Sequence, residues 1–352
     1  MTGNFHYEQA KDLLKHCRIA IYYPYDRTIT ENYHCETENG LLTYRSKYKL
    51  EKKIRNRSNM FQTMYHIKKE FQPDLIHAHV ATEAGRFAIM LGKLFSIPVM
   101  ITEHSAVEAS GVMTFPHYYY AKFAYKRSKY NVCVSDELAK RLHMIFPKIT
   151  FHVIYNGIIK PVVKKSSVYC KKSTVNVVMV AGMYDWNIKG IPTFMKVIRR
   201  LIGEGQSLTI HFVGGGEYFE QFIALSKELN IYENCVFYGN CDKNKVYDIV
   251  ADMDFLVSAS LFESFGCSMA EALMLGKPIL ATKSGGAQSI VNEKNGLLIE
   301  KDNEEALYNG MLYMMQNYQN YSAEQLADNA EENFEINRIS KKYLDIYMQI
   351  IH

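Results

Sequence analysis

Two glutamates separated by seven residues stand in the stretch FESFGCSMAEALMLG, residues 262–276. They are Glu263 and Glu271. A carboxylate accepts short, charge-assisted hydrogen bonds, and it can accept them from a pair of hydroxyl groups. The pair of glutamates therefore predicts a site for a ligand with two sets of hydroxyls, such as a sugar and a ribose.

The segment between the two glutamates is suited to an anion. Glu263 lies in a predicted strand-to-helix loop, and Glu271 lies in the first turn of the helix that follows. The backbone N–H groups of Phe265, Gly266 and Cys267 then point outward with the positive end of the helix dipole. A diphosphate fits there, so the stretch predicts a site for a nucleotide sugar.

A local interpretation of the same residues remains open. Ser268 and Glu271 have the S-x-x-E spacing of a capping box, in which Glu271 would only start its own helix. Glu263 would then be a solvated acid in a loop.

Further glycine-bearing loops follow strands predicted in the same half of the chain. They contain Gly182, then Gly214, Gly215 and Gly216, and then Gly285 and Gly286. Lys189, seven residues after Gly182, offers a cation for a phosphate. Several loops of this type at the strand ends of one domain favour the ligand-binding interpretation.

Short β-branched runs alternate with amphipathic helical stretches, which is typical of parallel sheets covered by helices. Strands are predicted in the first half at residues 18–23, 75–79, 99–102, 131–135 and 153–155. In the second half they are predicted at residues 175–181, 208–213, 236–238, 255–258, 279–282 and 297–299. The fold class is therefore α/β, with two Rossmann-like, doubly wound domains that face each other across a cleft.

The domain boundaries follow from composition. Residues 1–160 are predicted as the acceptor-side domain and residues 175–335 as the domain that binds the nucleotide sugar. The polar, basic residues 161–174 form the linker. Residues 336–352 form a last helix with an apolar face, which either crosses back to the N-terminal domain or packs on its own domain.

The stretch FESFGCSMAEALMLGKPILATKSGG resembles the signature of the family-four glycosyltransferases, in which two glutamates bracket the donor site. HFVGGGEYFEQF is similar to the strand and glycine loop of that family. PDLIHAH, IPVMITEHS, VCVSDEL and VIYNG resemble positions along its first domain, in the family's order. The resemblance covers nearly the whole chain. It implies GT-B architecture and transfer with retention, without an essential metal.

The resemblance also implies a role for each site residue. Glu263 contacts donor-sugar hydroxyls, Glu271 contacts the ribose of a UDP- or GDP-linked donor, and the amides of residues 265–267 face the sugar–phosphate region. His104 approaches the sugar from the first domain; a buried histidine bonded to backbone is the other interpretation. In front-face displacement the departing phosphate takes the acceptor proton, while Lys189 and the loop amides stabilise its charge.

The sequence departs from the family pattern at three places. Gly182 is followed by Met183 instead of the common arginine, and Gln288 and Ser289 stand where an acid is common. The chain begins with MTGNFHYEQAKDLLKH, which corresponds to the end of a loop and its helix, so the opening strand is missing. We expect the true start upstream of Met1; a rearranged first domain is the alternative.

Composition sets the expected compartment. Hydrophobic residues make up 48% of the chain and charged residues 22%, and no run of apolar residues is long enough to span a membrane. The seven cysteines show no C-x-x-C spacing, which argues for a reducing compartment and against both a disulfide framework and a zinc site. With no signal-peptide pattern at the N-terminus, the sequence predicts a cytoplasmic protein.

Two basic stretches suggest a surface for an anionic membrane. Residues 45–57 carry seven basic side chains against one acid, and residues 117–130 interleave lysine and arginine with tyrosine and phenylalanine. Cations beside interfacial rings suit the inner face of the plasma membrane, although a solvated face is the ordinary interpretation. No nucleic-acid-binding module is visible, so no nucleic-acid partner is expected.

These features predict an enzyme that moves a sugar to a glycan or polyprenyl-linked acceptor, in bacterial-type cell-surface polysaccharide synthesis. A catalytically weak, glycosyltransferase-like protein that stabilises an active enzyme is the alternative. A nicotinamide-dependent oxidoreductase is disfavoured, because GGGEYF at residues 214–219 lacks the last glycine of G-x-G-x-x-G.

Overall fold

The computed structural model describes residues 4–49, 53–104, 115–163 and 174–352. The chain divides into two compact units. The first contains Met1–Val134, Ala139–Gly157 and Ile336–His352, and the second contains Ser135–Leu138 and Ile158–Glu335. Most of the linker predicted at residues 161–174 lies outside the described residues.

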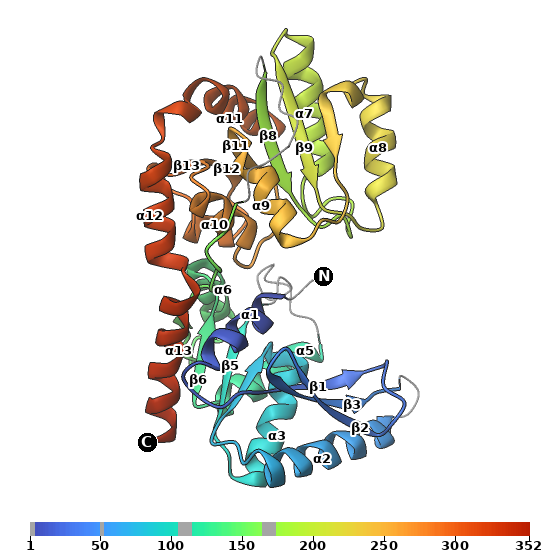
Figure 1. Cartoon of the computed structure of the whole chain (residues 1–352), viewed down its shortest axis with the longest axis vertical. Helices are drawn as coiled ribbons and strands as arrows, with labels where there is room; N and C mark the ends of the chain where they lie inside the picture. The colour runs from blue at the N-terminus through green and yellow to red at the C-terminus, as the bar shows by residue number, and fades with distance from the viewer. Residues whose placement is uncertain (1–3, 50–52, 105–114, 164–173) are drawn as a thin grey trace. The chain divides into compact units, whose positions relative to one another are not determined.

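The second unit is built on a six-stranded sheet with the order β10-β9-β8-β11-β12-β13 (Figure 1). All of its neighbouring strands are parallel. The strands are β8 (Val175–Val180), β9 (Leu208–Val213), β10 (Cys235–Phe237), β11 (Phe255–Ser258), β12 (Ile279–Thr282) and β13 (Gly296–Ile299). The order reverses between β8 and β11, as in a doubly wound fold, so the α/β prediction is confirmed.

Helices connect the strands of this sheet and bury its faces. They are α7 (Ile191–Gly203), α8 (Phe219–Glu228), α9 (Lys243–Ala251), α10 (Cys267–Met274), α11 (Glu304–Asn317) and α12 (Ala323–Phe334). Shorter turns are η2 (Tyr232–Asn234), η3 (Gly286–Ser289) and η4 (Tyr318–Asn320). Every residue of β9 is buried, which is expected of a central parallel strand with helices on both faces. Phe194 of α7 and Phe212 of β9 belong to the resulting core.

The first unit contains a four-stranded parallel sheet with the order β4-β5-β6-β7. Its strands are β4 (Ile76–His79), β5 (Val99–Glu103), β6 (Tyr130–Cys133) and β7 (His152–Val153). The first helix α1 (Asn4–Leu13) and the last helix α13 (Ile336–Ile351) pack together in this unit. Leu13, Met100, Val132, Ile339 and Tyr343 share one hydrophobic cluster, which holds both helices on the sheet.

A separate three-stranded sheet of the first unit was not expected from the sequence. It consists of β1 (Ala20–Asp26), β2 (Tyr33–Glu38) and β3 (Leu41–Lys47) in the order β1-β3-β2. The strand predicted at residues 18–23 therefore pairs with β3 and not with the four-stranded sheet. Asn39 and Gly40 both have positive φ, and they form the tight turn between β2 and β3.

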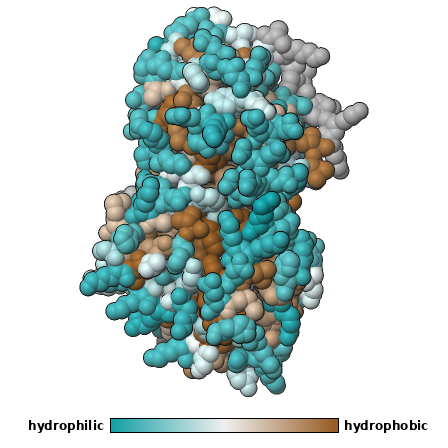
Figure 2. Space-filling view, turned by 90° about the vertical axis from the view of Figure 1, so that its left-hand side faces the viewer, coloured by the Kyte–Doolittle hydropathy of each residue, from teal (hydrophilic) through white to brown (hydrophobic). Residues whose placement is uncertain are grey.

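The remaining helices among the described residues are η1 (Ala81–Gly85), α2 (Lys53–Glu70), α3 (Arg86–Phe95), α5 (His117–Arg127) and α6 (Asp136–Ile145). No helix among the described residues is long and apolar enough to cross a membrane. The face drawn in Figure 2 is mostly hydrophilic, with apolar patches of limited extent.

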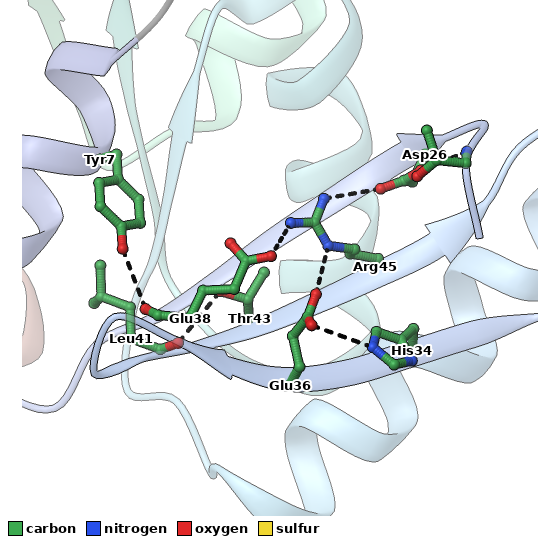
Figure 3. A network of polar contacts seen from close by, with 9 residues as sticks. Tyr7, Asp26, His34, Glu36, Glu38, Leu41, Thr43 and Arg45 are labelled. Carbon is green, nitrogen blue, oxygen red and sulfur yellow. Dashed lines mark hydrogen bonds and ion pairs between the residues drawn. The ribbon is translucent and has the colours of Figure 1, made fainter.

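Arg45 changes the interpretation of the basic stretch at residues 45–57. Its guanidinium lies 2.9 Å from Oδ2 of Asp26 and 3.2 Å from Oε1 of Glu36, and it also contacts Glu38 (Figure 3). Three carboxylates thus surround one cation on the small sheet. Arg45 consequently stabilises the pairing of β1, β2 and β3 and is not available to an anionic membrane.

Candidate functional site

Glu263 lies in the loop after β11, where the loop after β12 holds it in place. Its backbone N–H donates to Ser284 O (3.0 Å), and its carbonyl accepts from the Gly286 N–H (2.7 Å). These bonds join two loops at the carboxyl edge of the parallel sheet, which is where ligands bind in open α/β folds.

Gly285 and Gly286 permit this close contact. A Cβ at Gly285, whose φ is 115°, would lie 2.7 Å from the Glu263 carbonyl oxygen, and one at Gly286 would lie 2.2 Å from the Phe265 carbonyl oxygen. The Gly286 N–H is bonded to Glu263, and the Gly285 N–H donates to Oε1 of Gln288 (2.8 Å). The two glycines therefore shape the loop that carries Glu263, and their N–H groups donate within the protein.

Lys189 and Glu263 form an ion pair, with Nζ and Oε1 2.5 Å apart. Ser260 Oγ also donates to this carboxylate oxygen (3.0 Å). Lys189 precedes Gly190, which has a φ of 66° and lies just before α7. A Cβ at Gly190 would lie 2.1 Å from the Ala259 carbonyl oxygen, so only glycine fits here. The structure thus brings together the two residues predicted to serve the diphosphate and the sugar.

Glu271 points away from the start of its own helix. Its Oε1 accepts a hydrogen bond from the Tyr247 hydroxyl (3.2 Å) and lies 3.5 Å from Nζ of Lys243. Helix α10 begins at Cys267 after the N-cap Gly266, which makes no side-chain capping bond. The capping-box interpretation is therefore wrong, and Glu271 lies in the second turn of α10 and not in the first.

Phe265 fixes the backbone of the segment predicted to face a phosphate. Its side chain is buried, and its ring centroid lies 5.7 Å from that of Phe334. Gly266 has a φ of 104°, which reverses the chain so that α10 can start at Cys267. This geometry positions the predicted anion-binding segment, whose contact with a ligand stays a prediction.

The loops of Gly182 and of Gly214–216 contact each other. The Met183 N–H donates to the Gly215 carbonyl (3.0 Å), and the Gly214 N–H donates to the Gly239 carbonyl (2.9 Å). Met183, at the position where an arginine is common, is buried in the hydrophobic core. That position therefore supplies packing and no cation, and the Gly214 N–H is used within the fold.

Two lysines near the glutamates were missed by the sequence analysis. Lys243 lies beside Glu271, and Lys301 donates to the Leu261 carbonyl (3.2 Å) with its ammonium 4.4 Å from the centroid of the Phe262 ring. Lys301 comes shortly after β13, at the carboxyl end of another strand of the same sheet, and this position was the available signal. Together with Lys189 they place three cations near the two glutamates, which favours an anionic ligand.

His104 belongs to the first unit, directly after β5. Its Nε2 lies 3.0 Å from Nδ1 of His79, and its ring centroid lies 4.4 Å from that of His6. Burial lowers the pKa of His104 well below its usual value, so the imidazole is neutral near pH 7. The sequence analysis identified His104 but neither His6 nor His79 as part of this cluster.

Glu103 holds the backbone beside His104. It is fully buried, and its carboxylate accepts hydrogen bonds from the Tyr125 hydroxyl (2.7 Å), the Ala81 N–H (2.9 Å) and the His104 N–H (3.0 Å). Removal of this carboxylate would leave buried donors without an acceptor, so Glu103 is a positioning residue for His104.

Comparisons with known proteins cover both units. The alpha-monoglucosyldiacylglycerol synthase of Streptococcus pneumoniae is 22% identical over 311 residues, 81% of this chain and 69% of that protein. A glycosyltransferase of Methanocaldococcus jannaschii is 25% identical over 245 residues, 69% of this chain and 66% of that protein. A 4-alpha-N-acetylgalactosaminyltransferase of Campylobacter jejuni that acts on a diphospho-undecaprenol substrate is 32% identical over 111 residues, and the match spans only 31% of this chain and 30% of that enzyme.

Solved structures show the same fold at low sequence identity. A sucrose-phosphate synthase of Thermosynechococcus elongatus matches with a TM-score of 0.78 and 16% identity, over 98% of this chain and 92% of its own. The HepE protein of Anabaena in complex with UDP matches with a TM-score of 0.68 and 17% identity, over 81% of each chain. The predicted GT-B architecture is confirmed by these neighbours.

Two family models match adjacent parts of the chain. Residues 4–159 match the model described as Glycosyltransferase Family 4, and residues 164–333 match the model described as Glycosyl transferases group 1. The two matches together leave only short segments of the chain uncovered. The chain therefore belongs to the family-four glycosyltransferases.

Proposed function

We propose that this protein transfers a sugar from a nucleotide sugar to a glycan or lipid-linked acceptor in the synthesis of a cell-surface polysaccharide or glycolipid. The observation that carries the proposal is the pairing of Lys189 with Glu263 at the carboxyl edge of the parallel sheet, in the same unit as Glu271. Cations and carboxylates in adjoining loops suit a ligand that combines phosphates with hydroxyls.

The proposed reaction proceeds with retention and uses no metal in the transfer step. Glu263 accepts hydrogen bonds from the sugar, Glu271 accepts them from the ribose, and Lys189 neutralises the diphosphate as it departs. The departing phosphate oxygen takes the proton of the acceptor hydroxyl on the face where the new bond forms. The protein contributes mainly by stabilising that developing charge, with the preorganised ammonium of Lys189 and the backbone amides of residues 265–267.

The donor is proposed to carry UDP or GDP. UDP is bound by the HepE protein of Anabaena, whereas the similar starch synthase IV domain of Arabidopsis thaliana was solved with ADP. The names of two relatives contain lipids: the Streptococcus enzyme forms a monoglucosyldiacylglycerol, and the Campylobacter enzyme acts on a sugar linked to diphospho-undecaprenol. An acceptor at the inner face of the plasma membrane suits the exposed cations of α5, which are Lys122, Lys126 and Arg127.

Binding of UDP, GDP and ADP to the purified chain tests the donor site. We expect one nucleotide to raise the melting midpoint, because a ligand that binds only the folded state stabilises it. Glu271→Gln should reduce the shift, whereas Glu233→Gln, on an exposed turn, should retain it. An absent shift with all three nucleotides would contradict the proposed donor site.

A second function is favoured by one observation. Met183 is a buried core residue at the position where family members commonly carry an arginine. A chain with weakened diphosphate binding would act as a partner that stabilises an active glycosyltransferase. Hydrolysis or transfer of a bound nucleotide sugar by the purified chain separates the two functions, since only the enzyme consumes the donor.

A further inference from the structure

Three histidines from distant parts of the sequence meet in the first unit. His6 comes from α1, His79 ends β4, and His104 follows β5. One ring nitrogen from each histidine lies within 4.8 Å of the other two. The ring centroid of His6 lies 4.3 Å from that of His79 and 4.4 Å from that of His104. Among the residues whose side chains are described, this is the one group of three or more His, Cys, Asp or Glu with such spacing.

We propose that His6, His79 and His104 bind one divalent transition-metal ion, with Zn²⁺ as the ion that fits best. The proposal rests on these three side chains and not on the proposed transfer reaction. Imidazole nitrogens suit Zn²⁺, Cu²⁺, Ni²⁺ and Co²⁺, and three histidines leave a fourth position for water.

Two of the three ligand atoms already have nearly the spacing of a tetrahedral site, and the His6 nitrogen, which lies within 4.8 Å of both, has to move closer to them. With Zn–N bonds of about 2.0–2.1 Å, two ligating nitrogens lie about 3.3 Å apart. Nδ1 of His79 and Nε2 of His104 are 3.0 Å apart, so they need to separate by only a few tenths of an ångström. In the metal-free protein one of these atoms donates to the other. That ring takes its other tautomer when the metal binds, so its proton moves to the second ring nitrogen and no net proton is released.

A fourth histidine packs against the cluster and helps to hold it in place. His77 lies beside the cluster with its ring centroid 4.4 Å from that of His79. Its Nδ1 and Nε2 contact Tyr347 and Thr102, each at 2.7 Å, so His77 packs against a ligand and is not one itself.

A bound ion would connect α1 to the carboxyl ends of β4 and β5. These elements are far apart in sequence, and α1 otherwise packs on α13. The ion would therefore stabilise the N-terminal helix on the sheet and fix the ring orientation of His104.

Metal titration of the tag-free full chain, first stripped with a chelator, tests the proposal. We expect one Zn²⁺ per chain by calorimetry, a rise of the melting midpoint with Zn²⁺, and a visible d–d spectrum of tetrahedral type with Co²⁺. Each of His6→Gln, His79→Gln and His104→Gln should weaken the affinity by at least about 10-fold. His152→Gln, which changes an exposed ring, is the matched control and should bind as the wild type does.

Several results would overturn the site. They are no binding of Zn²⁺ or Co²⁺, wild-type affinity in all three ligand variants, or a thiolate-to-cobalt charge-transfer band that shows cysteine ligation. The melting midpoint of each metal-free variant reports whether it folds. Because the three ligands lie on three different elements, failure of one variant to fold leaves the other two to decide.

Discussion

The ammonium of Lys189 lies 2.5 Å from a carboxylate oxygen of Glu263, although 74 residues separate the two along the chain. Both side chains are partly exposed, at 24% and 19%. In the proposed mechanism the donor gives its diphosphate to Lys189 and its sugar to Glu263, so donor binding would replace this contact and couple the two interactions through one ion pair.

Lys189→Met should reduce activity far more than stability. Loss of one preorganised group that stabilises developing charge costs about 100-fold or more in turnover. The ion pair is partly exposed, so its removal should cost only about 1 kcal/mol of unfolding free energy. Turnover of a nucleotide sugar and the urea-unfolding midpoint give the two values. Lys196→Met, an exposed lysine of α7, is the control and should change neither. Wild-type turnover in Lys189→Met would remove Lys189 from the proposed mechanism.

The strands that the sequence predicted best are the buried ones of the second unit. The structure places β9, β11 and β12 at the predicted bounds, because a strand covered on both faces is a continuous apolar run with clear ends. The helix predicted at residues 336–352 is α13. Its apolar periodicity and the extended Glu335 before it explain this success.

The small sheet of the first unit was missed for an identifiable reason. Strand β2 reads YHCETE, which is polar, and the last residues of β3, from Arg45 on, were interpreted as the start of a basic run. The dipeptide Asn39-Gly40 is a strong hairpin signal and was overlooked. The sequence correctly predicted that Glu263 lies in a strand-to-helix loop, but the pairing of Lys189 with Glu263 depends on loop geometry that no local pattern encodes.

Arg45→Met should destabilise the first unit. Asp26 is 7% exposed and would remain close to Glu36 and Glu38 without their common cation. We expect a loss of about 2 kcal/mol in unfolding free energy, between the values typical of exposed and buried ion pairs. Arg57→Met, an exposed change on α2, is the control. Equal unfolding midpoints for the two variants would contradict the role assigned to Arg45.

The effect of Arg45→Met should shrink in acid. Burial raises the pKa of Asp26, but hydrogen bonds from Thr28 and Arg45 outweigh burial and hold the pKa at about 2, below the usual 3.8. The contribution of Asp26 to stability is therefore complete above about pH 3.8 and is lost as the pH falls through about 2. Unfolding midpoints of both proteins between pH 7 and pH 2 should converge; a constant difference would contradict this linkage.

His211 should make the second unit sensitive to mild acid. It is fully buried on β9, its Nδ1 lies 2.9 Å from the Tyr238 hydroxyl oxygen, and burial lowers its pKa from 6.5 to about 4. Between these pH values the unfolded chain binds a proton that the folded protein does not bind. Stability from His211 is thus complete above pH 6.5 and declines as the pH falls toward 4.

A neutral replacement isolates this effect from other titrations. His211→Gln should lower the melting midpoint at pH 7.5, and its midpoint should fall less steeply than that of the wild type between pH 6.5 and pH 4.5. His152→Gln, with an exposed ring, should follow the wild-type curve. Parallel curves for His211→Gln and the wild type would show that His211 does not supply the pH dependence.

Helix α5 should contribute to the electrostatic part of the proposed membrane binding. Lys122, Lys126 and Arg127 are exposed on α5, and Tyr119 presents a ring that is 59% exposed on the same helix. Each cation near an anionic bilayer contributes about 1 kcal/mol, so Lys126→Gln with Arg127→Gln should weaken vesicle binding by roughly 10- to 30-fold. Co-sedimentation with phosphatidylglycerol vesicles at low salt measures this change, and vesicles of neutral lipid should bind weakly.

Lys341→Gln with Lys342→Gln removes the same charge from exposed positions of α13 and separates a local effect from net charge. Equal weakening by the two pairs would mean that binding follows total charge, and α5 would lose its proposed role as the surface that meets the lipid-linked acceptor.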